Sequence, residues 1–230
     1  MRLTLVAAVV LGLVGFEANA QALKTEDDKT LYALGLSVGR SLELFQLTPA
    51  ELEVVKKGLS DAITKAKPAV ELETYGPKIQ DLANARRSKQ GEANLKTGND
   101  YLAKAAKEKG ATKLPSGVIY KETKAGTGES PKATDTVKVH YRGTLLNGTE
   151  FDSSYKRGEP ISFPLNAVIP CWTEGVQKLK VGGKAQLVCP ANTAYGERGS
   201  PPNIPPQSTL IFDVELIAIE KGAAPQGGQQ

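Results

Sequence analysis

The spacing of apolar residues changes partway along the chain, and this change limits the possible folds more than any other feature. Between Thr30 and Lys109 apolar residues recur every three or four positions, the pattern of amphipathic helices. Between Leu114 and Glu220 apolar and polar residues alternate, as they do from Val137 to Tyr141, the pattern of half-buried strands. Helices followed by an antiparallel sheet carrying one short helix predict an α+β fold.

The first part of the helical half contains two short apolar stripes. One comprises Leu31, Leu34, Val38, Leu42 and Phe45, and the other comprises Leu52, Val55, Leu59 and Ile63. The sequence Thr48-Pro49-Ala50-Glu51 is a capping box with proline at the first helical position, so the second helix begins there and ends near Lys67-Pro68. Stripes this thin make a poor core for one chain. We therefore expect residues 21–70 to be an all-α dimerisation domain that packs against a second copy.

Residues 71–113 predict a long connecting helix, which Gly110 ends. Apolar residues become sparse between Leu82 and Tyr101, and basic and acidic residues mix after Arg86. The whole chain has 29 basic and 25 acidic residues, and this small excess does not indicate a nucleic-acid partner. The charges indicate a solvated helix face, so we expect an exposed spacer arm.

Both ends of the chain differ from the rest. Residues 1–20 resemble a secretory signal, with Arg2, an apolar run from Leu3 to Phe16, and a cleavage site after Ala20. The run of about 14 residues is shorter than the roughly 20 that a membrane anchor needs. No other segment predicts a membrane span, so we expect export to a bacterial periplasm. Residues 221–230 are rich in Gly and Gln and predict a disordered tail.

The composition excludes most metal-dependent and nucleophilic enzymes. The chain has one histidine, His140, and two cysteines, Cys171 and Cys189, which are too few for the common zinc sites. Alternation places His140 on the face opposite Val139 and Tyr141, where it should meet solvent rather than a substrate. We therefore expect neither a metal nor another cofactor.

In an oxidising compartment the two cysteines favour a disulfide. A bond between Cys171 and Cys189 would close a loop of about 17 intervening residues. By reducing the entropy of the unfolded chain, such a bond would stabilise the fold by roughly 3 kcal/mol. Two buried thiols that never meet remain the alternative.

Aromatic residues gather in the second half, from different predicted strands, loops and the short helix. Six of them are Tyr141, Phe151, Phe163, Trp172, Tyr195 and Phe212. Aromatic residues on alternating faces usually form a core, and composition alone does not separate a core from the wall of a pocket.

Six short motifs follow one another in the same half. They are Val139-His140-Tyr141-Arg142-Gly143, Phe151-Asp152-Ser153-Ser154, Val168-Ile169-Pro170, Trp172-Thr173-Glu174-Gly175, Ala194-Tyr195-Gly196 and Phe212-Asp213-Val214-Glu215-Leu216. Over residues 114–220 this series resembles the FK506-binding-protein (FKBP) type of peptidyl-prolyl cis–trans isomerase. The helical half, with Tyr32-Ala33-Leu34-Gly35, resembles the N-terminal dimerisation domain of the exported Mip/FkpA group.

The resemblance implies a half-wrapped antiparallel sheet around the short helix that carries Trp172, on whose indole a prolyl ring would rest. It implies a catalytic set of Tyr141, Phe151, Asp152, Tyr195 and Phe212. It also implies a substrate-binding set of Arg157, Phe163, Val168, Ile169, Trp172 and Ile204. The sequence departs from the family pattern at Ile161, Cys171, Ser200 and Asn203.

The implied activity is isomerisation of X-Pro bonds in unfolded or partly folded exported proteins, with chaperone activity. Such an enzyme needs no cofactor, and FK506-like or rapamycin-like macrolides should inhibit it. A non-catalytic dimeric holdase chaperone that binds proline-containing segments is the alternative.

Overall fold

A computed structural model describes residues 23–220, so the predicted signal segment and the predicted tail lie outside the described residues. The structure divides into two units between Ser41 and Leu42. Within its described residues the first unit consists mainly of helix α1 (Glu26–Leu42), whose last residue falls in the second unit and which has no buried residue.

The second unit begins with helices. They are η1 (Glu43–Phe45), α2 (Pro49–Thr64) and α3 (Leu72–Ala105). The capping box at the start of α2 is confirmed, because the Thr48 hydroxyl accepts from the Glu51 N–H and the Glu51 carboxylate accepts from the Thr48 N–H. An ion pair between Arg86 and Glu51 joins α3 to α2.

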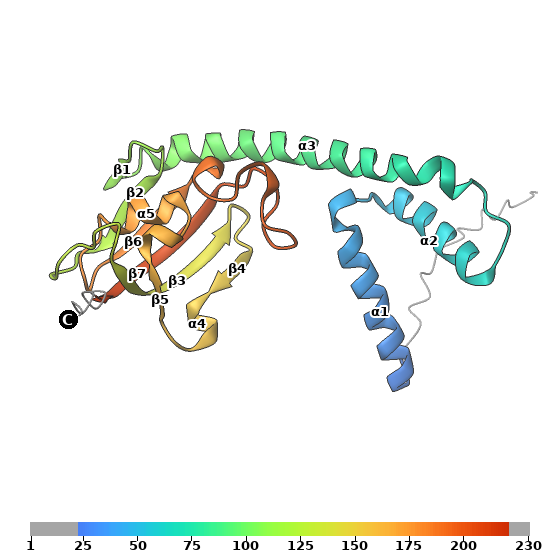
Figure 1. Cartoon of the computed structure of the whole chain (residues 1–230), viewed down its shortest axis with the longest axis horizontal. Helices are drawn as coiled ribbons and strands as arrows, with labels where there is room; N and C mark the ends of the chain where they lie inside the picture. Colours follow the sequence, from blue (N-terminus) through green and yellow to red (C-terminus); the bar gives the residue numbers. More distant parts are fainter. Residues whose placement is uncertain (1–22, 221–230) are drawn as a thin grey trace, which may run out of the picture. The chain divides into compact units, whose positions relative to one another are not determined.

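The predicted antiparallel sheet is present and has seven strands in the order β1-β2-β6-β7-β3-β4, with β5 also paired to β3 (Figure 1). The strands are β1 (Ala111–Lys113), β2 (Ile119–Lys124), β3 (Thr136–Leu145), β4 (Glu150–Ser153), β5 (Ile161–Pro164), β6 (Lys184–Cys189) and β7 (Leu210–Glu220). Between them lie α4 (Ser154–Arg157), η2 (Leu165–Ala167), α5 (Pro170–Val176), η3 (Ala191–Thr193) and η4 (Gly196–Arg198). The α+β prediction is therefore confirmed.

The core of this part lies between α5 and one face of the sheet. Alternate residues of β3 and β7, such as Val137, Val139 and Leu216, are fully buried there. Gly175 lets α5 approach closely, because a Cβ at this position would lie 2.7 Å from a methyl carbon of Leu187 in β6. The helix thus lies almost directly on the strands.

The expectation that α3 is an exposed spacer arm is wrong for the second half of that helix. Three of its buried residues, Gly91, Gly98 and Ala105, are seven positions apart and so share one face. Ala105 packs against Ile119 and Val188 of the sheet. The sequence prediction failed because small residues bury little apolar surface and so leave no hydrophobic stripe.

The end of α3 also differs from the prediction. The helix stops at Ala105, and the chain turns through Gly110, whose φ of +82° is in the left-handed region that glycine adopts readily. Residues 111–113 then form β1 and pair with β2, so the sheet begins before residue 114. The short helix α5, which carries Trp172, spans Pro170–Val176.

We predict that Gly98→Ala lowers the stability of the protein. A Cβ there would lie 2.2 Å from the Thr209 hydroxyl oxygen and 3.1 Å from the Thr209 Cβ. Overpacking of this kind costs about 1–3 kcal/mol, more than the roughly 1 kcal/mol by which helix propensity favours alanine. Thermal unfolding followed by circular dichroism should show a lower midpoint.

Gly58→Ala is the matched control, because nothing lies within 4 Å of a Cβ at this position of α2. It should leave the midpoint unchanged or raise it. Equal midpoints for the two variants would show that α3 does not pack closely on Thr209.

Candidate active site

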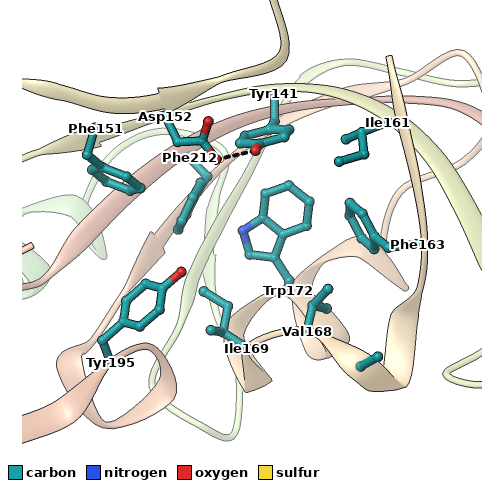
Figure 2. Close-up of a pocket in the computed structure, with 11 residues that line it drawn as sticks. Tyr141, Phe151, Asp152, Ile161, Phe163, Val168, Ile169, Trp172, Tyr195 and Phe212 are labelled. Carbon is teal, nitrogen blue, oxygen red and sulfur yellow. Dashed lines mark hydrogen bonds between the residues drawn. The ribbon is translucent and has the colours of Figure 1, made fainter. Parts of the chain in front are cut away.

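A cavity of about 320 Å³ opens on the inner face of the sheet, beside α5 and the loop that follows β6. It is lined by Tyr141, Phe151, Asp152, Ile161, Phe163, Ala167, Val168, Ile169, Trp172, Tyr195 and Phe212. Nine of these eleven residues belong to the two sets that the resemblance implied. Figure 2 shows how side chains from several separate elements converge around one indole ring.

Trp172 forms the floor of the cavity and is only 4% exposed. Tyr141 and Phe212 pack edge-on against its ring, with centroids 5.1 and 5.2 Å away, and Phe163 lies tilted at 5.3 Å. The indole Nε1 is buried and finds no hydrogen-bond partner within residues 23–220. These aromatic contacts fix the ring, so it presents a rigid apolar surface to the cavity.

The start of α5 places Trp172 and leaves one backbone donor available. Ile169 is the residue that caps α5, and its carbonyl accepts from the N–H groups of Trp172 (2.9 Å) and Thr173 (3.2 Å). Pro170 follows at the first helical position, where its missing N–H costs nothing. The N–H of Ile169 donates no hydrogen bond within the described part of the chain, and Ile169 lines the cavity.

A polar cluster of Tyr141, Asp152 and Arg157 forms the rim. The Tyr141 hydroxyl donates to Asp152 Oδ2, drawn as the dashed line in Figure 2, and accepts from Arg157 Nη2 at 2.8 Å. Arg157 Nη1 also donates to Asp152 Oδ1 at 2.6 Å, and this oxygen accepts from the Ser153 N–H at 2.8 Å. Every polar group of the cluster is therefore engaged with another.

The cluster holds its members in one protonation state. Burial alone would raise the pKa of Asp152, but hydrogen bonds from Tyr141 and Arg157 outweigh burial and hold this pKa below its ordinary value. Burial and the hydrogen bond to Asp152 raise the pKa of Tyr141. Asp152 is thus an anion and Tyr141 a neutral phenol across the physiological range.

Tyr195 stands on the other side of the cavity and is 40% exposed. Its hydroxyl makes no hydrogen bond to another of the described residues. Burial, and then the charge of Asp152, raise the pKa of Tyr195, so the hydroxyl remains a donor. In contrast to the saturated hydroxyl of Tyr141, it is available to a ligand.

Two of the residues that the resemblance implied do not line the cavity. Arg157 reaches it only through Asp152 and Tyr141. Ile204 is 4% exposed and belongs to the core, where its backbone pairs with Ser200. Burial of an aliphatic side chain within a proline-rich loop leaves no signal in a single sequence.

Two lining residues were not in the predicted sets. Ile161 had been noted only as a departure from the family pattern, although its spacing of two from Phe163 places both on one face of β5. Ala167 lies in η2, and nothing in the sequence marks a small residue there.

Cys171 and Cys189 are joined by a disulfide, with Cα atoms 5.6 Å apart, and both side chains are fully buried. The bond connects the first turn of α5, next to Trp172, to the last residue of β6. The floor of the cavity is thus tied to the sheet behind it.

His140 lies on the opposite face of β3 from the cavity, as alternation indicated, but it is half-buried rather than free in solvent. Its Nδ1 is 3.0 Å from the Ser154 hydroxyl, and its ring stacks on Tyr155 with centroids 4.6 Å apart. Residues 23–220 contain no group of histidine, cysteine and acidic side chains that could hold a metal ion.

Known proteins resemble this chain in sequence and in fold. A family model described as "FKBP-type peptidyl-prolyl cis-trans isomerase" matches residues 127–217, and one described as "Domain amino terminal to FKBP-type peptidyl-prolyl isomerase" matches residues 27–121. "FKBP-type peptidyl-prolyl cis-trans isomerase FkpA" of Aeromonas hydrophila is 47% identical over 220 residues, which cover 90% of this chain and 82% of the relative. The chain belongs to the FKBP-type peptidyl-prolyl cis–trans isomerases.

Other known proteins are similar to most of the chain. "Outer membrane protein MIP" of Legionella longbeachae is 36% identical over 97% of this chain and 100% of its own length. The crystal structure of FkpA from Escherichia coli has a TM-score of 0.67 and 41% identity, and the match covers 87% of this chain and 99% of that one. The protein is accordingly an FKBP-type enzyme that catalyses rotation about peptide bonds preceding proline. Among its described residues no helix is both long and apolar enough to span a membrane.

We predict that kcat/KM for an uncharged X-Pro peptide is constant, within about twofold, from about pH 5 to about pH 9. The ordinary pKa values of Asp152 and Tyr141 are 3.8 and 10.0, and the cluster moves the first down and the second up, so neither group titrates in this window. Stabilisation from the Asp152 anion is present above its ordinary pKa and is lost only as the pH falls through the lowered value.

Asp152→Asn is the control, because it cannot ionise and should lower kcat/KM by the same factor at each pH in the window. A bell-shaped profile centred inside the window in the wild type would contradict the prediction.

Proposed function

We propose that the cavity floored by Trp172 is the active site and that it works without covalent chemistry. An X-Pro bond resists rotation because amide resonance places charge on its oxygen and nitrogen, giving a barrier of about 18–20 kcal/mol. An apolar cavity disfavours this charge-separated form and so weakens the partial double bond. A wall shaped for the twisted amide, rather than for either planar isomer, then lowers the barrier.

In this proposal the prolyl ring rests on the indole of Trp172. The surrounding wall consists of Tyr141, Phe151, Phe163, Val168 and Phe212. Support comes from the burial of Trp172 and its three aromatic contacts, which give the prolyl ring a fixed apolar seat. A rigid seat holds the ring while the rest of the peptide turns.

Two donors would hold the carbonyl groups of the substrate. They are the N–H of Ile169 and the hydroxyl of Tyr195, and both lack partners within the described residues. Because these two donors have no partner there, each gains a hydrogen bond when the substrate binds. The Tyr141 hydroxyl already donates to Asp152 and would have to break that hydrogen bond first. Asp152, held by Arg157, would orient Tyr141 and add a fixed negative charge at the rim.

We predict that Tyr195→Phe and Asp152→Ala each lower kcat/KM for a short X-Pro peptide by about three- to tenfold, the effect of losing one or two hydrogen bonds. The relaxation of the peptide after a jump in its cis content measures this rate. An FK506-like competitor should abolish the catalysed phase.

Tyr155→Phe is the matched control, because it removes a tyrosine hydroxyl on the opposite face of the sheet. It should leave the rate unchanged. If the three variants were equally active, the site would lie elsewhere; if the wild-type chain only suppressed aggregation of an unfolded protein and did not accelerate the peptide, the holdase alternative would be favoured.

We propose exported proteins with X-Pro bonds as the substrates, unfolded or partly folded, in the periplasm after cleavage at Ala20. Uncatalysed isomerisation takes tens to hundreds of seconds and can limit folding there. The name of the Legionella relative, an outer membrane protein, supports an envelope location. A dimer with two cavities would also hold unfolded chains by avidity, which supports a chaperone role.

We propose that residues 21–70 dimerise, that α3 connects them to the rest, and that residues 114–220 together with β1 form the isomerase domain. Neither α1 nor α2 buries a residue in the single chain. Large apolar side chains such as Leu31 (64% exposed) and Ile63 (73% exposed) remain uncovered. Isolated helices of this length are marginal in water, so a second copy is the partner that would stabilise them.

We predict that the chain sediments as a dimer and that Leu31→Asp weakens the dimer by tenfold or more. Leu31 lies in the apolar stripe of α1, and burying a leucine contributes about 1.5–3 kcal/mol. Ala33→Asp is the matched control, because it adds the same charge two residues along, on the other side of the helix. A wild-type chain that sediments as a monomer, or two variants that dissociate equally, would contradict the arrangement.

A further inference from the structure

We propose that the second half of α3 positions the loop between Tyr195 and Thr209, and that Asn94 is a positioning residue for Tyr195. The helix would then do more than connect two regions of the enzyme, because it would set one wall of the cavity. This inference rests on the proposed role of Tyr195 in the active site.

The loop is closed on itself by backbone hydrogen bonds. Ser200 and Ile204 exchange two hydrogen bonds of 2.8 and 2.9 Å, which form a narrow tip. Below the tip the Gln207 N–H donates to the Gly196 carbonyl at 2.8 Å, and the Gly199 N–H donates to the Tyr195 carbonyl at 3.2 Å. Movement at Gln207 is therefore passed directly to the residue that follows Tyr195.

The loop has few other attachments to the sheet. Pro201, Pro202 and Asn203 at the tip are exposed, and the side chain of Ile204 enters the core. The two prolines at 205 and 206 have no N–H to donate, so this arm of the loop gains little from backbone hydrogen bonds. The arm also contacts α3.

Three residues of α3 meet the returning arm of the loop on one helix face. Asn94 Nδ2 donates to the Pro206 carbonyl at 2.7 Å. One turn earlier, a Cβ on Gly91 would lie 3.2 Å from the Gln207 side chain, and one turn later Gly98 allows the close approach of Thr209. Asn94 thus sits between two contacts that bring the helix and the loop together.

The backbone of Gln207 has an unfavourable conformation that its neighbours must maintain. Its φ is +55°, in the left-handed region that residues other than glycine occupy at a cost of about 1 kcal/mol or more. The Asn94 hydrogen bond fixes the peptide group immediately before Gln207. Without this hydrogen bond the Gln207 backbone can relax, and the Gln207–Gly196 contact next to Tyr195 relaxes with it.

The test compares Asn94→Asp with Asn99→Asp in the full chain. Aspartate keeps the shape of asparagine but has no N–H to give, and its negative oxygen repels the Pro206 carbonyl. Asn99 is exposed on the same helix, so its substitution matches the change of charge without touching the loop. We expect Asn94→Asp to lower kcat/KM about fivefold and Asn99→Asp to leave it within about twofold, with both variants folded at the assay temperature.

A double-mutant cycle with Tyr195→Ala separates positioning from general support. If Asn94 acts through Tyr195, Asn94→Asp should change kcat/KM by less than about twofold once the tyrosine ring is absent. The same fivefold loss on both backgrounds, or no loss in Asn94→Asp alone, would overturn the inference while leaving the proposed site intact. A Tyr195→Ala variant with wild-type activity would instead overturn the role of Tyr195 and, with it, the inference.

Discussion

The cavity exists because the helix on the inner face of the sheet is much shorter than the strands that it covers. With seven residues, α5 is about 10 Å long, whereas the ten residues of β3 extend over about 33 Å. The helix cannot cover the whole apolar face. Aromatic side chains from β3, β4, β5 and β7 cover most of the remainder, and their size and rigidity leave a hollow rather than a collapsed core. The cavity is the part of the sheet that the helix leaves open.

An enzyme that breaks no covalent bond can be built this way, because it needs a shape more than it needs reactive groups. The polar residues at the rim form hydrogen bonds with one another, and each keeps its protonation state across the physiological range. The available donors lie on the opposite side, at Ile169 and Tyr195. In the proposed mechanism the two sides of the cavity therefore have different roles. The rim provides a constant charge, and the opposite side provides donors for the carbonyl groups of the rotating peptide.

The sequence predicted the structure well where buried apolar residues recur at a regular spacing. It predicted little where small residues form the contact between two elements. Alternation located β3 and its inner face, and the resemblance implied nine of the eleven residues that line the cavity, Trp172 among them. The packing of α3 was missed because its contact residues form no apolar stripe. Gly91 and Gly98 allow the loop to approach the helix closely, and Asn94 donates a hydrogen bond to it. The end of α3 was missed because Ala106 to Lys109 are ordinary helix residues, and pairing of β1 with β2 decides where the chain leaves the helix. The burial of Ile204 could not be predicted, because it depends on how the loop folds back onto the core.

The disulfide extends the same logic to the back of the cavity. Cys171 precedes Trp172 in the first turn of α5, and Cys189 ends β6 immediately before the segment that leads to Tyr195. One bond therefore constrains both the floor and the start of the opposite wall, at positions that lie in the interior and cannot touch a substrate. Under the proposed mechanism, which depends on the shape of the cavity, this bond would support the reaction without touching the substrate. Cys171 is one of the positions at which the chain departs from the family pattern, and this departure adds a covalent bond between the helix and the sheet.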